Sequence, residues 1–161
     1  MTIQESLVSI ANTRTYFLML ADSLIDQELN RIPTGYRNNV VWHLGHIVSV
    51  QQSLCYRLSG LPIVIPTEIS EKYARHTKPD IFIQIEEIQI LKENLFLTLK
   101  QLKADLDAKR FLHYKPYITV TNEKLVNIDD ALRFDAFHEL LHLQKAFQIR
   151  DVNMLSNRDE K

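Results

Sequence analysis

Two histidines near the end of the chain have the spacing of metal ligands. His138 and His142 lie four residues apart in the segment 137–142, Phe-His-Glu-Leu-Leu-His. On a helix this spacing places the second side chain one turn further along and about 40° around the axis, so both imidazoles can reach one ion. The pair also shares its helical face with apolar residues and should point inward. Buried imidazoles need partners for their nitrogens, so the pattern predicts a metal, with ordinary hydrogen bonds as the alternative.

The same residues spell the HExxH signature of zinc peptidases. In that class two histidines bind zinc and the glutamate activates water, which makes Glu139 a candidate catalytic base. Glu139 lies about 100° around the helix from His138, so it can equally face a neighbouring helix or solvent. A peptidase also needs a third ligand downstream and an edge strand for the peptide. The 19 residues after His142 show neither, so peptidase remains a minor alternative.

A second pair of histidines, His43 and His46, lies in the first half of the chain. A metal site in the core of a helical bundle takes its ligands from facing helices, and either histidine can serve. The apolar stripe of this segment passes nearer His43, so periodicity does not choose between them. Asp135, three residues before His138, is a candidate acceptor for an imidazole N–H, or a solvated carboxylate.

The elements that must position these histidines follow from the helix-breaking residues. Pro33 and Gly35 end the first segment, Gly60, Pro62 and Pro66 end the second, Pro79 opens the third, and Pro116 lies between the third and the fourth. Within each segment apolar residues recur at three- and four-residue steps, which is typical of amphipathic helices. We therefore expect helices over about 3–30, from Asn38 or Asn39 to 59, 79–106 and 128–152.

Four such helices bury their apolar stripes most completely in a bundle in which the stripes face one another. The sequence thus predicts a single all-α domain, an antiparallel four-helix bundle, over residues 1–152, with 153–161 as a flexible C-terminal tail. Two longer connections, 61–78 and 111–126, join the helices. The second contains a short β-like stretch, 117–121.

The composition favours a soluble globular protein, with 45% hydrophobic and 24% charged residues. A formal charge of -1 gives no global attraction for nucleic acid, and no apolar run is long enough to span a membrane. The N-terminal residues do not have the pattern of a signal peptide. The single cysteine, Cys55, excludes an intrachain disulfide and suits a reducing compartment, so we expect a cytoplasmic protein.

Two segments together resemble the DinB superfamily. They are 38–47, Asn-Asn-Val-Val-Trp-His-Leu-Gly-His-Ile, and 138–143, His-Glu-Leu-Leu-His-Leu. In that family a tryptophan lies four residues before a ligand histidine on the second helix, and an HxxxH pair on a later helix completes the site. The resemblance, which spans the chain to about residue 152, selects His46 over His43. The ligand set that it implies is His46, His138 and His142.

The resemblance further implies an up-down-down-up bundle, a homodimer, and a divalent metal such as zinc, nickel or iron. Members of the family resemble metal-dependent hydrolases, transferases that use bacillithiol or mycothiol, and the metal-binding domain of sulfoxide-forming enzymes of ergothioneine synthesis. The last group carries HxxxHxE, whereas this chain has Gln144 in place of that glutamate and lacks the group's large catalytic domain. Sulfoxide formation is therefore not carried over.

Three neutral imidazoles leave at least one metal coordination position open, which is typical of a catalytic site. We therefore expect a metal-dependent hydrolase or thiol transferase that acts on a small molecule, with a low-molecular-weight thiol as one candidate. The competing hypothesis is a non-catalytic dimeric bundle, in which the metal is structural or an exposed helix face binds a partner.

Overall fold

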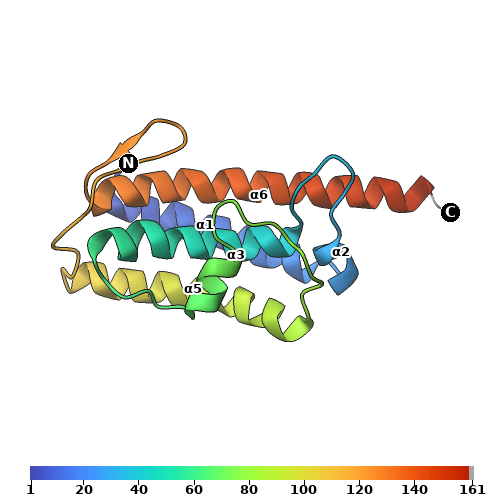
Figure 1. Cartoon of the computed structure of the whole chain (residues 1–161), viewed down its shortest axis with the longest axis horizontal. Coiled ribbons are helices and arrows are strands. Elements are labelled where there is room, and N and C mark those ends of the chain that lie inside the picture. The colour runs from blue at the N-terminus through green and yellow to red at the C-terminus, as the bar shows by residue number, and fades with distance from the viewer. Residues whose placement is uncertain (160–161) are drawn as a thin grey trace.

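Long helices that lie alongside one another form most of the molecule (Figure 1). The computed structural model describes the backbone of residues 1–159 and the side chains of residues 1–155. The long helices are α1 (Ile3–Asp22), α3 (Val40–Gln51), α5 (Ile85–Asp107) and α6 (Ile128–Asp159). Both α1 and α3 pack against α5 and against α6. The predicted all-helical bundle is thus confirmed at the level of fold class, and its up-down-down-up order stays a prediction.

The first predicted helix, 3–30, is divided into two. A capping box between Thr2 and Glu5 begins α1, which ends at Asp22, and α2 (Asp26–Asn30) follows. Between them the Ser23 hydroxyl donates to the Leu20 carbonyl at 2.7 Å, and Ile25 has extended backbone. A serine side chain that bonds to the preceding turn competes with the helical ladder, which explains the break.

The second helix begins where the sequence predicts. The Asn39 side chain accepts a hydrogen bond from the Trp42 N–H at 2.8 Å and caps α3. Beyond Gln51 the helix widens into a π-helical turn, η1 (Gln52–Tyr56), and then tightens into a 3-10 turn, η2 (Arg57–Ser59), before Gly60 ends it at a φ of 72°. A π-helical turn changes the direction in which later side chains point.

The third helix begins later than Pro79 suggests, at Ile85. The residues just before it stay outside the helix because the Asn30 side chain bonds to both backbone groups of Ile83, donating to its carbonyl at 3.0 Å and accepting from its N–H at 2.7 Å. The connection before it holds a short helix that the sequence did not predict, α4 (Thr67–Lys72).

The β-like stretch is confirmed in shorter form, as an antiparallel hairpin of β1 (Tyr117–Ile118) and β2 (Lys124–Leu125). The last helix, α6, runs past the predicted end at 152 to Asp159. Within the predicted tail, Asn153 is buried and its side chain donates to the Arg31 carbonyl at 3.4 Å. Residues 160–161 of that tail lie outside the described residues.

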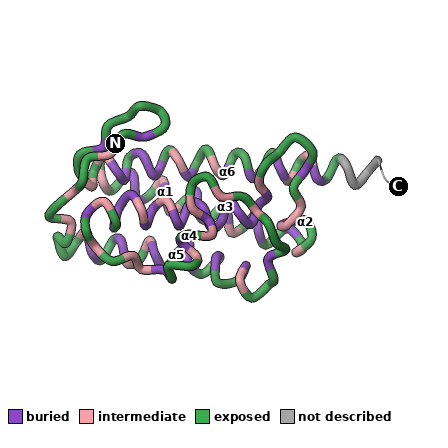
Figure 2. Tube along the Cα trace, viewed as in Figure 1, coloured by how far each residue is buried: buried purple, intermediate pink, exposed green. Residues whose placement is uncertain are grey.

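Buried residues line the inward faces of the long helices and form two apolar clusters (Figure 2). One contains Phe17 and Leu95, and the other Ile10 and Leu102. Arg14, a buried charged residue of α1, lies along that helix between Ile10 and Phe17, which belong to different clusters. Over the described part of the chain, no helix combines the length and the apolar character needed to cross a membrane.

Candidate metal centre

The structure brings the three predicted ligands together between two neighbouring helices. His46 comes from α3, and His138 and His142 come from α6. One nitrogen of each ring can be chosen so that all three lie within 4.8 Å of one another. His46 is buried and His138 is partly exposed. The four-residue spacing on α6 therefore places both rings on the face that meets α3.

The ring of His46 is fixed from two sides. Its Nδ1 lies 2.8 Å from the Tyr73 carbonyl, and because a carbonyl only accepts, Nδ1 must carry the proton and Nε2 is left for a metal. The Trp42 indole stacks on the other side, with ring centroids 4.2 Å apart, and donates its N–H to the Thr77 hydroxyl at 2.9 Å. Trp42 thus packs directly against the candidate ligand.

Gly45 allows the Tyr73 segment to approach α3. A Cβ atom at this position would lie 2.2 Å from Cγ of the Tyr73 ring, so any other residue would displace the ring. The ring is held on its far side as well, because its hydroxyl donates to Glu87 at 2.6 Å. Sequence reasoning missed this role, although a glycine inside a helical segment was a signal of close approach.

His43 is a partner of a candidate ligand rather than a member of the group. Its Nδ1 lies 2.8 Å from Nδ1 of His142, so one of the two nitrogens donates and the other accepts. When Nδ1 of His142 is the donor and Nδ1 of His43 the acceptor, Nε2 of His142 carries no proton and is left for a metal. The geometry therefore agrees with the choice of His46 over His43 and gives His43 a different function, that of orienting His142.

We expect His43→Ala to weaken zinc binding by roughly 10- to 100-fold, because the loss of a residue that orients a ligand has an effect of this size. The dissociation constant can be measured by competition with a chromophoric chelator. His113→Ala, at an exposed histidine outside the group, is the matched control and should bind zinc as the wild type does. Wild-type affinity in His43→Ala would show that the contact with His142 is packing only.

The histidines at this site are neutral near pH 7. Burial lowers the pKa of His46 to about 4, and burial together with neighbouring His46 lowers the pKa of His138 to about 3. The pKa of His142 is lowered still further, first by burial and then by the two other rings. Neutral imidazole is the form that binds metal, so no proton has to be removed before an ion is bound.

A cavity of about 560 Å³ opens beside the three histidines. Apolar side chains, among them Leu54 of η1 and Phe134 and Leu141 of α6, form much of its wall, and the hairpin contributes Tyr117 and Val120. A volume of this size is typical of sites for small molecules.

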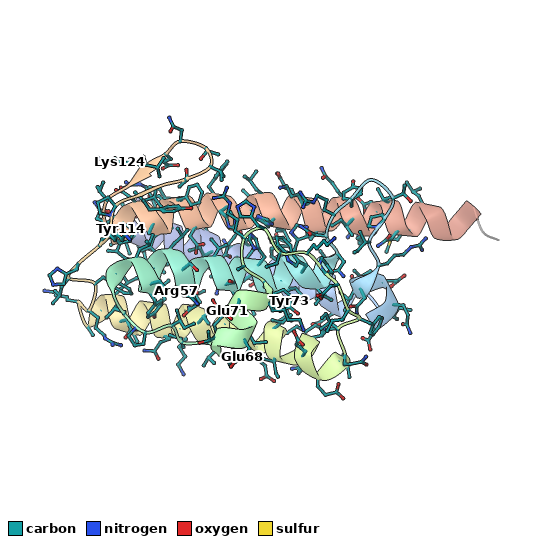
Figure 3. The ribbon with its side chains drawn as sticks, viewed as in Figure 1. Arg57, Glu68, Glu71, Tyr73, Tyr114 and Lys124 are labelled. Atoms are coloured by element: carbon teal, nitrogen blue, oxygen red, sulfur yellow. The ribbon has the colours of Figure 1, made fainter. Side chains whose placement is uncertain are left out.

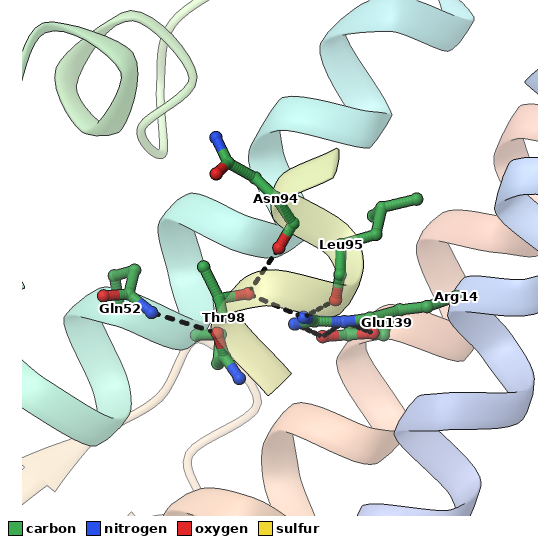
Figure 4. A network of polar contacts seen from close by, with 7 residues as sticks. Arg14, Gln52, Asn94, Leu95, Thr98 and Glu139 are labelled. Atoms are coloured by element: carbon green, nitrogen blue, oxygen red, sulfur yellow. Dashed lines mark hydrogen bonds and ion pairs between the residues drawn. The ribbon is translucent and has the colours of Figure 1, made fainter. Parts of the chain in front are cut away.

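Glu139, the predicted catalytic base, does not line this cavity. Its carboxylate forms an ion pair with Arg14, in which the Nη2–Oε1 distance is 2.6 Å and both side chains are fully buried (Figure 4). Arg14 also donates to the Leu95 carbonyl at 2.6 Å and to the Thr98 hydroxyl at 2.9 Å. This geometry favours a structural function for Glu139 over the base predicted from the HExxH pattern.

Asp135, the predicted acceptor for an imidazole, is buried next to the same ion pair. No N–H or hydroxyl group of the described residues donates to its oxygens, so a hydrogen bond between Asp135 and Glu139 requires that one of the two carboxyls carries a proton. Burial, reinforced by the charge of Glu139, raises the pKa of Asp135 well above its usual value, so the carboxyl is held protonated. The nitrogen Nδ1 of His138 has no hydrogen-bond partner among the described residues, so Asp135 does not orient this ring.

The donor set fits a divalent transition metal. Three neutral imidazole nitrogens are a common ligand set for zinc, nickel or iron(II), and two of the rings are already oriented by hydrogen bonds. A four-coordinate ion held this way would keep one position for water or substrate.

A family model and a solved structure are similar to this chain. A model of the DinB superfamily matches residues 9–146. A crystal structure described as the conserved protein of a locus from Enterococcus faecalis is similar in fold, with a TM-score of 0.65 and 16% sequence identity over 92% of this chain and 95% of that chain. No curated protein matches the sequence.

Proposed function

This chain belongs to the DinB superfamily, and we propose that it is a metal-dependent enzyme, a hydrolase or a thiol transferase, that acts on a small molecule. The metal is held by His46, His138 and His142. The observation that carries the proposal is the convergence of three neutral imidazoles at the edge of a cavity large enough for a substrate.

A catalytic site fits these residues better than a closed structural site. Structural zinc sites use four protein ligands, whereas the group found among the described residues offers three. The hydrogen bond that His46 donates to the Tyr73 carbonyl and the one between His142 and His43 hold two rings in place before any ligand is bound. Such preorganisation is expected where a site must keep its geometry while one position exchanges ligands.

When bound, a divalent metal would supply Lewis acidity toward water or would bind a thiol as the thiolate. The chain's own residues would do the rest. The apolar walls exclude water from around the substrate, and the fixed histidines hold the reacting centre at one edge of the cavity. Zinc, nickel and iron(II) all fit the proposal, and a low-molecular-weight thiol is a candidate substrate.

The alternative is a non-catalytic dimeric bundle with a structural metal or a partner-binding face. Large apolar side chains that are exposed on two packed helices favour it, including Tyr16 and Met19 on α1 and Phe137 and Leu140 on α6. We propose that a homodimer forms in either case. A cytoplasmic location is also proposed, supported by the free and buried thiol of Cys55.

The experiment that tests the proposal compares metal-free protein with protein reloaded with zinc, nickel or iron(II). We expect at least a tenfold higher rate with one of these metals, in the hydrolysis of p-nitrophenyl butyrate or in the transfer of cysteine to monochlorobimane. Melting temperature is measured on the same samples, because a structural site couples metal binding strongly to stability. A large stabilisation without reaction on either substrate would support the non-catalytic alternative.

A further inference from the structure

Three basic side chains line the same cavity as the three histidines. They are Arg57 of η2, Arg75 in the segment after α4, and Lys145 of α6. No aspartate or glutamate is among the residues that line it. The cavity therefore carries a positive charge of three, although the whole chain has a formal charge of -1.

None of these three side chains is in an ion pair within the described part of the chain. Arg57 is held by a hydrogen bond, since its Nη2 donates to the Ser70 hydroxyl at 3.3 Å. It lies beside α4, which carries Glu68 and Glu71 (Figure 3), yet neither carboxylate forms an ion pair with it.

Lys145 lies closest in sequence to the metal ligands. It follows His142 by three residues on α6, so the two side chains share one face of the helix. Lys145 lines the same cavity as His46 and His138, so its ammonium group and these rings face one space. A negative group bound by Lys145 would therefore lie within reach of the histidine group.

The rest of the wall suits an apolar body. Leu54, Phe134, Leu141 and Val120 face the cavity together with the ring of Tyr117. Contact between such a wall and the carbon atoms of a ligand stabilises binding by roughly 25 cal/mol per Å² of apolar surface removed from water. The cavity thus combines an apolar wall with unpaired cations, and each recognises a different part of a ligand.

We propose that the substrate is an organic anion with an apolar or aromatic body. Its negative group, a carboxylate, phosphate or sulfonate, is bound by Arg57, Arg75 and Lys145 while the body lies against the apolar wall. The inference rests on the proposed function and deepens it by naming the substrate class. Positive walls also concentrate anions near the site, so binding weakens as salt concentration rises.

The test compares two dyes that share one body and differ in charge. The probes are 8-anilinonaphthalene-1-sulfonate and N-phenyl-1-naphthylamine, titrated by calorimetry into metal-free and zinc-loaded protein. We expect the sulfonate to bind more tightly, and Arg57→Gln, Arg75→Gln and Lys145→Gln each to weaken it about three- to tenfold. The neutral dye should be unaffected. Lys100→Gln, at an exposed lysine of α5 outside the cavity, is the matched control.

Ser53→Trp locates the binding site, because Ser53 lines the cavity and the larger side chain should fill it and abolish binding of both dyes. The proposal is overturned if the two dyes bind equally, if the glutamine variants bind the sulfonate as the wild type does, or if Ser53→Trp leaves binding intact. Titration of metal-free protein separates this test from the proposed function. If the protein binds no metal but still binds the sulfonate more tightly than the neutral dye, the proposed function fails and this inference stands. If dye binding does not depend on charge, only this inference fails.

Discussion

His138→Ala is expected to lower bound zinc from nearly one ion per chain to nearly none. The variant removes one of three donor nitrogens, so affinity should fall by more than the roughly 100-fold upper range for residues that only orient a ligand. His46→Ala and His142→Ala should behave alike. Elemental analysis of purified protein, after incubation with zinc and removal of the free ion, measures the metal content.

His138 is the most informative of the three positions. His46 and His142 each make a hydrogen bond whose loss would leave a buried partner, whereas Nδ1 of His138 bonds to no other described residue. Its replacement therefore tests ligation with the least damage to the surroundings. Circular dichroism checks that the helices remain, and His113→Ala is the control.

Two outcomes would contradict the site. Retention of zinc in a folded His138→Ala variant would place the ion elsewhere. A wild-type protein that takes up neither zinc, nickel nor iron(II) would end the metalloenzyme proposal and leave the partner-binding alternative. Stoichiometric metal that depends on all three histidines would justify a wider screen of hydrolytic and thiol-transfer substrates.

The sequence predicted the long helices well because an amphipathic stripe is a local property. It failed where a distant or competing contact decides the backbone. The side chain of Asn30 bonds to the backbone of Ile83, 53 positions away, and keeps that segment out of the helix. Ser23 ends α1 inside an apolar stripe that continues past it. The π-helical turn at 52–56 likewise left no periodic signal.

The candidate site, too, was predictable where its geometry is local and not where it depends on distant contacts. The four-residue spacing of His138 and His142 was readable, because both lie on one helix face. The choice of His46 over His43 needed the resemblance to a family, since it depends on how α3 meets α6. The function of Glu139 was not readable from its motif, because its partner Arg14 lies 125 positions away. The available signal was Arg14, a single arginine between Ile10 and Phe17 on an apolar helical stripe, which indicates a buried charge that needs a partner.

Glu139→Ala is expected to lower the free energy of unfolding by about 3–5 kcal/mol, which is the typical cost of removing one partner of a buried ion pair. The guanidinium of Arg14 is fully buried and would keep only its bonds to Leu95 and Thr98. Urea denaturation of the metal-free protein at one pH measures the change.

The double variant Arg14→Met, Glu139→Leu is the matched control. It removes both charges and keeps apolar volume between the two clusters of the core, so most of the lost stability should return. The Thr98 hydroxyl retains its bond to the Asn94 carbonyl at 2.7 Å, and only the Leu95 carbonyl loses its side-chain partner. A double variant no more stable than Glu139→Ala would show that the ion pair is not the source of the effect.

The ionisation of Asp135 affects how much stability Glu139→Ala loses within the expected range of about 3–5 kcal/mol. Its carboxyl is held protonated partly by the charge of Glu139, so removal of Glu139 lowers its pKa and lets it ionise beside Arg14. This replacement partner reduces the cost of Glu139→Ala, and Asp135→Asn added to Glu139→Ala should restore the full cost. In Glu139→Ala we expect the charge of Arg14 to bring the pKa of Asp135 below its value in the unfolded chain, so that this contribution to stability is present above the unfolded pKa and is lost as pH falls through the folded pKa.

The same double variant separates the structural function of Glu139 from a catalytic one. If Arg14→Met, Glu139→Leu folds, binds zinc as the wild type does and retains metal-dependent activity, Glu139 serves the helix packing that holds His138 and His142 in place. If it folds and keeps its metal but loses activity, the carboxylate takes part in the chemistry despite its burial. Measurement of stability, metal content and rate on this one variant therefore decides whether Glu139, the glutamate of the HExxH pattern, is structural or catalytic.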